Sequence, residues 1–114
     1  MFDLTQPIVE VALGQWQALK ADNVQAAYDQ YTSTSFKQQT AFSEFKAFAD
    51  NLKSAGVLSN DSKMVFLSRQ IENNRGELSG YVTTPSGKLN VVYQLVKESN
   101  GWRIEYMNFD YTEK

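Results

Sequence analysis

The sequence predicts an α+β domain in which three N-terminal helices pack on a curved, four-stranded antiparallel meander. Apolar residues recur at helical spacing through the first half of the chain. The last third is instead rich in Val, Tyr, Ile, Leu and Thr, and it contains two hairpin signals, at 85–88 and 99–102. Helices followed by a run of hairpin-connected strands are typical of the α+β class.

The helices are placed by their caps and their apolar stripes. The first is predicted from an N-cap at Thr5 to 20–21, and the second from 22–23 to about Tyr31. Residues 32–35 are predicted to be a polar break, and a third helix runs from a Thr40 cap to 55–56. The stripe of the first helix consists of Ile8, Val9, Ala12, Leu13, Trp16 and Leu19.

Four strands are predicted at 64–72, 77–84, 89–98 and 102–110. Two-residue turns centred on 74–75, 86–87 and 100–101 then fix which side chains share a face. The face expected to lie under the helices carries Val65, Leu67, Ile71, Leu78, Val82, Leu89, Val91, Leu95, Trp102 and Ile104. The opposite face carries Phe66, Tyr81, Val92, Val96, Met107 and Phe109.

That opposite face is half apolar, which allows three interpretations, the first being that the N-terminal helix wraps it. A second copy of the chain could cover it in a homodimer, because a two-fold contact uses one patch twice. Alternatively, these are single apolar residues on an ordinary surface.

Composition limits the function classes. A chain of 114 residues forms one domain, spanning 1–114, and its 42% hydrophobic residues supply a core. Cysteine and histidine are absent, which excludes disulfides and the common zinc and His-dependent catalytic sites, so we expect neither metal nor cofactor. The net charge of −2, with scattered Lys and Arg, argues against nucleic-acid binding.

The sequence contains no membrane span, since no apolar run approaches the roughly 20 residues that a spanning helix needs. Residues 1–3 do not begin a signal peptide. We therefore expect a cytoplasmic location, or a periplasmic or secreted one if a leader preceded Met1.

A pocket between helices and sheet is the predicted binding site, because a curved sheet under helices makes a concave apolar cavity. Gly80 lies beside Arg69 and Tyr93, where a missing side chain would bend the strand or leave room for a ligand. Arg69 would orient an anionic or carbonyl group on a small apolar ligand. The predicted ligand-binding residues are Trp16, Tyr28, Arg69, Tyr93, Trp102 and Tyr106.

Two other interpretations of these residues remain. Arg69 could extend to solvent or pair with a carboxylate, and each tyrosine could bury its ring while its hydroxyl stays exposed to solvent. A Tyr106 hydroxyl acting with Asp110 or Arg69 would resemble the acid/base pair of an isomerase or dehydratase. Asp110 lies near the end of a strand, where an exposed carboxylate is the ordinary outcome.

Several motifs resemble those of small bacterial domains in the nuclear transport factor 2-like superfamily, which has a cystatin-like fold. They are Ala27-Tyr28, the segment 33–36, the Phe-rich segment 42–48, and Gly101-Trp102-Arg103-Ile104. The resemblance covers nearly the whole chain and implies a cone-like domain, often envelope-associated. The superfamily includes isomerases, transport adaptors and scaffolds, so fold similarity implies no activity.

From these observations we favour a non-catalytic module that binds a small molecule or assembles with other proteins. The isomerase-like enzyme is the alternative. It is less favoured because the isomerase-like relatives place an acid/base group inside the cone, and this chain has no histidine there.

Overall fold

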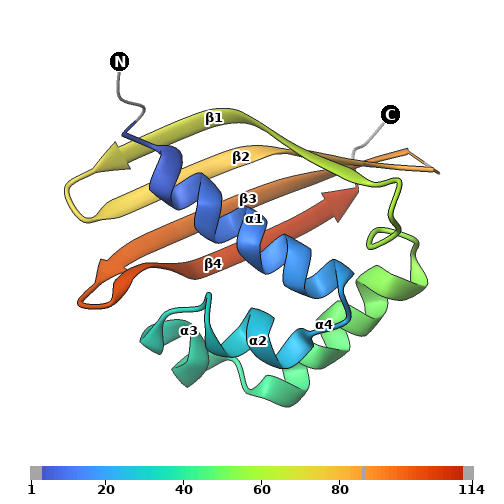
Figure 1. The fold of residues 1–114 in the computed structure, drawn as a ribbon, viewed down its shortest axis with the longest axis horizontal. Helices are drawn as coiled ribbons and strands as arrows, with labels where there is room; N and C mark the ends of the chain where they lie inside the picture. Colours follow the sequence, from blue (N-terminus) through green and yellow to red (C-terminus); the bar gives the residue numbers. More distant parts are fainter. Residues whose placement is uncertain (1–3, 86, 112–114) are drawn as a thin grey trace.

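The fold contains one antiparallel sheet with helices on one face and along one edge (Figure 1). The structure is a computed structural model, and it describes residues 4–85 and 87–111. The strands follow the order β1-β2-β3-β4, so the predicted α+β meander is confirmed. The elements are α1 (Gln6–Lys20), α2 (Val24–Asp29), α3 (Thr34–Gln39), α4 (Phe42–Ser54), β1 (Lys63–Glu72), β2 (Arg75–Thr84), β3 (Gly87–Glu98) and β4 (Gly101–Tyr111).

A fourth, short helix replaces the polar break predicted at 32–35. Ser33 is its N-cap, and the Ser33 side chain accepts a hydrogen bond from the Phe36 backbone N–H at 3.0 Å. The serine that suggested a break is therefore a helix start signal. In the part of the chain that the structure describes, no helix is both long and apolar enough to cross a membrane.

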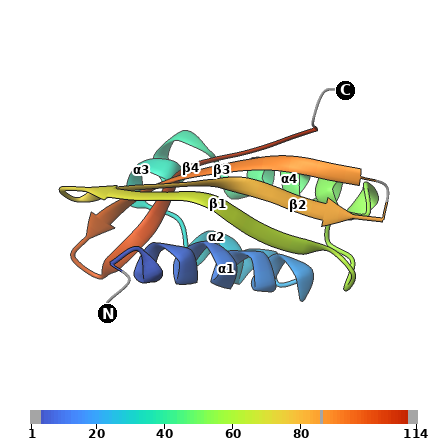
Figure 2. The ribbon, with the colours of Figure 1, turned by 90° about the horizontal axis from the view of Figure 1, so that it is seen from above.

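Only α1 covers the face of the sheet, as Figure 2 shows from above, whereas α2, α3 and α4 lie along the β4 edge. The apolar stripe of α1 packs on side chains from all four strands. A second cluster lies where the end of α1 meets α2 and α4, and it is centred on Leu19, Ala27, Tyr28, Phe45 and Ala49. Met107 on β4 packs against both clusters and joins them.

The three hairpins are closed by the pairs Glu72–Arg75, Thr84–Gly87 and Glu98–Gly101. Each closing pair lies one residue earlier than the predicted turn. Such a shift changes each cross-strand partner by two residues and therefore leaves every side chain on its predicted face.

Two bulges do change the facing. The register shifts at Leu67 in β1 and at Glu105 in β4, and each shift leaves one extra residue in an edge strand. Because side chains alternate, an extra residue reverses the facing of everything beyond it. Val65 and Leu67 were therefore wrongly predicted to face α1, and they are 38% and 74% exposed.

The second half of β4 is reversed in the same way. Met107 pairs with the buried Tyr93, and Phe109 pairs with the buried Val91, so both point toward α1. Tyr106 turns to the outer face, where it is 48% exposed.

Three residues of the predicted dimer face therefore belong to the core, because the bulges reverse them. Phe66 contacts the Tyr93 ring at 6.0 Å, and Phe109 stacks on Trp16 at 6.1 Å between ring centroids. Met107 is the third. Tyr81, Val92 and Val96 keep their predicted outward facing and are half-buried.

Candidate functional site

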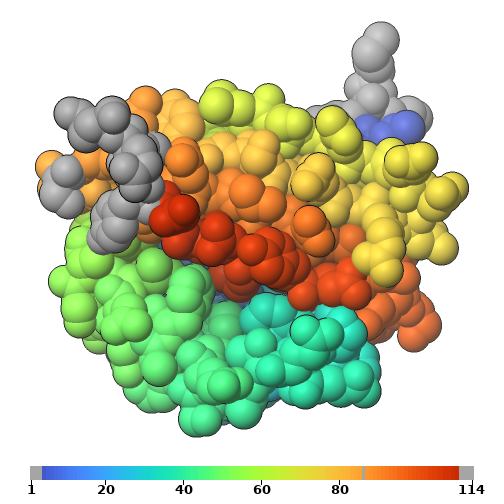
Figure 3. Space-filling model, turned by 180° about the vertical axis from the view of Figure 1, so that it is seen from behind, coloured from blue at the N-terminus to red at the C-terminus, as the bar shows by residue number. Residues whose placement is uncertain are grey.

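A groove lies between β4 on one side and α3 and α4 on the other. It encloses about 260 Å³. Figure 3 shows it from behind as the furrow between red β4 and the green and cyan helices. The residues that line the groove are Phe36, Gln39, Thr40, Glu44, Phe45, Phe48, Glu105, Tyr106 and Met107.

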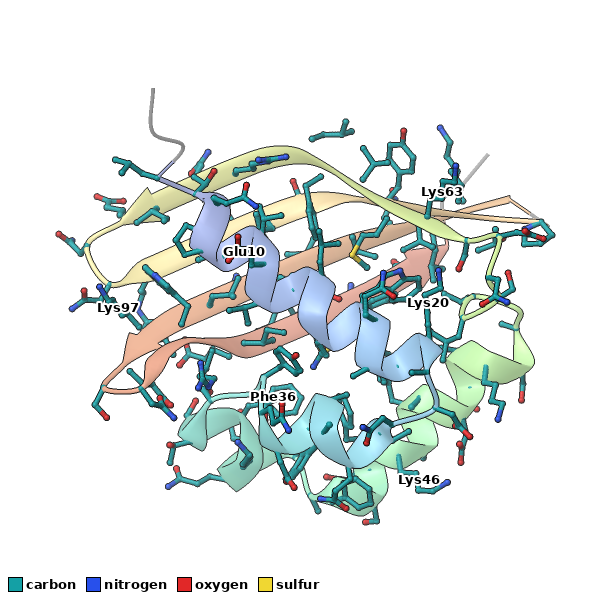
Figure 4. The ribbon with its side chains drawn as sticks, in the orientation of Figure 1. Glu10, Lys20, Phe36, Lys46, Lys63 and Lys97 are labelled. Carbon is teal, nitrogen blue, oxygen red and sulfur yellow. The ribbon has the colours of Figure 1, made fainter. Side chains whose placement is uncertain are left out.

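The helical wall is built on an aromatic cluster around Tyr28. Phe36, Phe42 and Phe45 contact the Tyr28 ring with centroid distances of 5.5 to 6.3 Å, and Phe48 extends the cluster from Phe45. Figure 4 places Phe36 in the space between α3 and β4. Edge-to-face and tilted contacts of this kind stabilise aromatic pairs beyond the area they bury, so the apolar side of the groove is fixed by packing.

The connection between α3 and α4 is held by two hydrogen bonds. The Tyr28 hydroxyl donates to the Thr40 backbone oxygen at 2.6 Å. The Glu44 carboxylate accepts from the Ala41 backbone N–H at 3.0 Å, which satisfies one of the free amides at the start of α4. Thr40 and Glu44 both line the groove, so these bonds fix its rim.

The strand wall depends on the β4 bulge. Glu105, the extra residue, accepts a hydrogen bond from Ser35 Oγ at 3.2 Å and forms an ion pair with Arg75. One residue earlier in α3, the Thr34 backbone N–H donates to the Glu98 carboxylate at 3.0 Å. Two carboxylates of the β3–β4 hairpin therefore tie the start of α3 to the sheet.

The predicted pocket under α1 is filled by the protein's own side chains. Trp16 and Tyr93 are 2% and 0% exposed, and the rings of Phe109 and Phe66 pack against them. Burial raises the pKa of the Tyr93 phenol well above its ordinary value. Among the described residues, its hydroxyl has no hydrogen-bond partner.

The remaining predicted site residues do not gather in one place. Tyr28 is buried behind the groove wall, and Trp102 packs on the core near the β3–β4 turn. Arg69 is exposed on β1, at the sheet edge opposite β4. Tyr106 alone of the six lines the groove, and it does so from the outer face rather than the predicted inner one.

The proposed acid/base pair is not brought together. Tyr106 and Asp110 are four residues apart on one strand, a separation of about 13 Å at the usual rise per residue. Arg69 and Tyr106 lie three strand spacings apart, about 14 Å. Neither partner can share a proton with the Tyr106 hydroxyl in this arrangement. Within residues 4–85 and 87–111, no three Asp or Glu side chains gather as metal ligands.

The other groove residues were not predicted as a site. The Phe-rich helix was interpreted as core, which is correct for Phe45, while Phe48 also reaches the groove. The Ser33 cap could have revealed α3 and so placed Phe36 beside β4. No sequence signal marks Glu105 as a bulge residue.

The arrangement defines a cone-like domain of the nuclear transport factor 2-like, cystatin-like fold. Solved structures of this class match over most of the chain. A protein of unknown function from Shewanella oneidensis has a TM-score of 0.68 at 16% identity, covering 92% of this chain and 97% of that one. A second, from Shewanella baltica, has a TM-score of 0.67 at 12% identity, covering 98% and 100%.

The chain belongs to the family described as "Domain of unknown function (DUF4864)", whose model matches residues 2–110. A phospholipid-binding protein from Ralstonia solanacearum, solved with a phospholipid, has a TM-score of 0.57 at 15% identity. That match covers 95% of this chain and 78% of the Ralstonia protein. No curated protein matches the sequence. At these identities the structural matches establish the fold alone.

Proposed function

We propose that the domain is a non-catalytic binding module that holds a small apolar or amphipathic molecule in the groove between β4 and α3–α4. The observation that carries this proposal is the make-up of the groove. Phe36, Phe45, Phe48 and Met107 form an apolar floor, and polar side chains surround it. An apolar concavity with a few convergent polar groups is the usual form of a small-molecule site.

The size of the groove limits the ligand. Pockets that bury drug-sized molecules enclose about 300–1,000 Å³, and the groove, at about 260 Å³, lies just below that range. It therefore suits a small molecule or one segment of a longer one. The phospholipid in the Ralstonia protein supports an amphipathic ligand in a domain of this fold.

The anionic ligand predicted from Arg69 is not part of this proposal. Arg69 lies on β1, across the sheet from the groove. The charged residues that line the groove are Glu44 and Glu105, which would repel an anion.

A titration of the ¹⁵N-labelled protein with 1-octanol, followed by amide chemical shifts, tests the proposal. We expect saturable shifts concentrated at 36–48 and 105–107. Gln39→Trp should weaken binding at least about fivefold by placing an indole in the hollow, since one or more lost apolar contacts cost 1 kcal/mol or more. Gln38→Trp, on the neighbouring exposed residue outside the groove, should bind like wild type. Shifts confined to other surfaces, or equal effects of the two variants, would refute the proposal.

Assembly through the outer sheet face is the second candidate function. The observation that favours it is the exposure of Leu67 and Val65 on the strand that borders Tyr81. The proposed homodimer face thus consists of Val65, Leu67, Tyr81, Val92 and Val96, without Phe66, Met107 and Phe109. Sedimentation equilibrium should show a dimer that Leu67→Lys dissociates. A monomer at high micromolar concentration would exclude it.

A further inference from the structure

We infer that the ligand of the groove carries a cationic ammonium group. This inference rests on the proposed function and adds the charge of the ligand. Of the nine groove residues, two are carboxylates and none is basic. A bound anion would lie beside like charges, whereas an ammonium group would gain attraction from both.

The Glu44 carboxylate is fixed at the rim and forms no ion pair with any residue that the structure describes. Its hydrogen bond from the Ala41 N–H holds it at the first turn of α4. None of the ion pairs between described residues includes Glu44.

The neighbouring lysines are engaged elsewhere. The Lys37 ammonium donates to the Thr32 oxygen at 2.8 Å and lies over the Tyr28 ring. Lys46 pairs with Asp50 at 3.2 Å, on the side of α4 away from the sheet (Figure 4). Neither of them lines the groove.

The Glu105 carboxylate attracts an ammonium group less strongly than Glu44 does, because Arg75 already neutralises part of its charge. It is nevertheless held in place by Ser35 and lines the opposite wall. A ligand with an ammonium group at the mouth would therefore lie between the Glu44 carboxylate on α4 and the partly neutralised Glu105 carboxylate on β4.

The aromatic residues favour the same class of ligand. Phe36 and Phe48, which are partly buried, line the groove beside the buried Phe45, and the Tyr106 ring stands at its strand wall, 48% exposed. A cation within about 6 Å of a ring face is attracted by the ring quadrupole. An alkyl chain can pack on the same rings, so a short alkylammonium group matches both the floor and the rim.

Three ligands with one chain length separate this inference from the proposed function. Octylammonium, 1-octanol and octanoate are titrated into the full chain at pH 7, where an alkylamine, like lysine, is protonated. We expect octylammonium to bind about 1.4- to fivefold more tightly than octanol, the range of exposed charge pairs. Octanoate should bind most weakly, and 0.5 M salt should reduce the differences.

Matched variants assign the preference to Glu44. Glu44→Gln keeps an acceptor for the Ala41 N–H and should fold, but it should lose most of the octylammonium preference. Asp50→Asn removes a carboxylate from the same helix outside the groove and should retain the preference. If octanol binds the wild type as tightly as octylammonium, or if both variants behave alike, the cationic inference is wrong and the binding proposal stands. If none of the three ligands shifts the groove amides, the binding proposal itself is wrong.

Discussion

Gly80 is where the β1 bulge can be tested directly. A Cβ built at this position would lie 1.9 Å from the Val65 backbone oxygen and 2.8 Å from the Phe66 Cα. Real Cβ contacts essentially never fall below 3.0 Å, and these neighbours are backbone atoms that cannot rotate away. Gly80→Ala must therefore push β1 outward by about 1 Å, and we expect a loss of about 2–3 kcal/mol in unfolding free energy.

Gly76→Ala is the matched control in the same strand. There a Cβ would lie 3.0 Å from Ile8 Cδ1, a side-chain atom that can move. Alanine also restricts the unfolded chain, which offsets part of the crowding by about 0.4–1 kcal/mol. We therefore expect Gly76→Ala to change stability by less than about 1 kcal/mol.

Urea unfolding followed by tryptophan fluorescence measures both variants, since Trp16 is buried in the core. The informative quantity is the difference in unfolding free energy between the two variants, because both replace a glycine of β2 by alanine. If Gly80→Ala is as stable as Gly76→Ala, β1 does not pass over Gly80 as described. The outward facing of Val65 and Leu67 would then be wrong as well.

Two further predictions concern tyrosine hydroxyls and use the same unfolding assay. Tyr28→Phe removes the hydrogen bond to the Thr40 oxygen and should cost about 1 kcal/mol; an unchanged stability would mean that this bond does not hold the α3–α4 connection. Tyr93→Phe removes a buried hydroxyl without a partner among the described residues, so it should be neutral or stabilising at pH 7. Burial raises the pKa of Tyr93, so only the unfolded chain ionises this phenol near its ordinary pKa; the group therefore leaves wild-type stability unchanged below pH about 10 and lowers it as the pH rises above that value. Tyr93→Phe should therefore lose less stability than wild type between pH 9 and 11, and parallel losses would contradict the buried phenol.

Apart from α3, which replaces a predicted break, the elements of the fold were predictable because each has a local cause. The apolar stripe of α1 and the Phe-rich stripe of α4 recur at helical spacing, and both helices form. The three hairpins close within one residue of their predicted positions. Errors of one residue in the turn positions did not change the predicted facing of the side chains, because they shift each cross-strand partner by two residues.

The bulges could not be predicted, because the edge strands are ambiguous in sequence. In β1, Val65 and Leu67 alternate with Met64 and Phe66, so either phase offers apolar residues to the core. In β4 the same ambiguity holds for Tyr106 against Met107 and Phe109. Contacts distant in sequence make the choice: Trp16 stacks on Phe109, and Gly80 leaves room for β1 to shift.

The ambiguity decided the location of the site as well as the facing of residues. In an unbulged β4, Tyr106 would point toward α1, and Met107 would face outward instead of joining the two apolar clusters. The bulge turns Met107 inward beneath the groove and leaves Glu105 where Ser35 and Arg75 both reach its carboxylate. The bulge thus sets both the register of β4 and the lining of the groove. A binding site predicted on an edge strand therefore depends on contacts far from that strand in sequence. The same reversal brings the Phe109 ring against Trp16 and Tyr93, where the pocket under α1 was predicted.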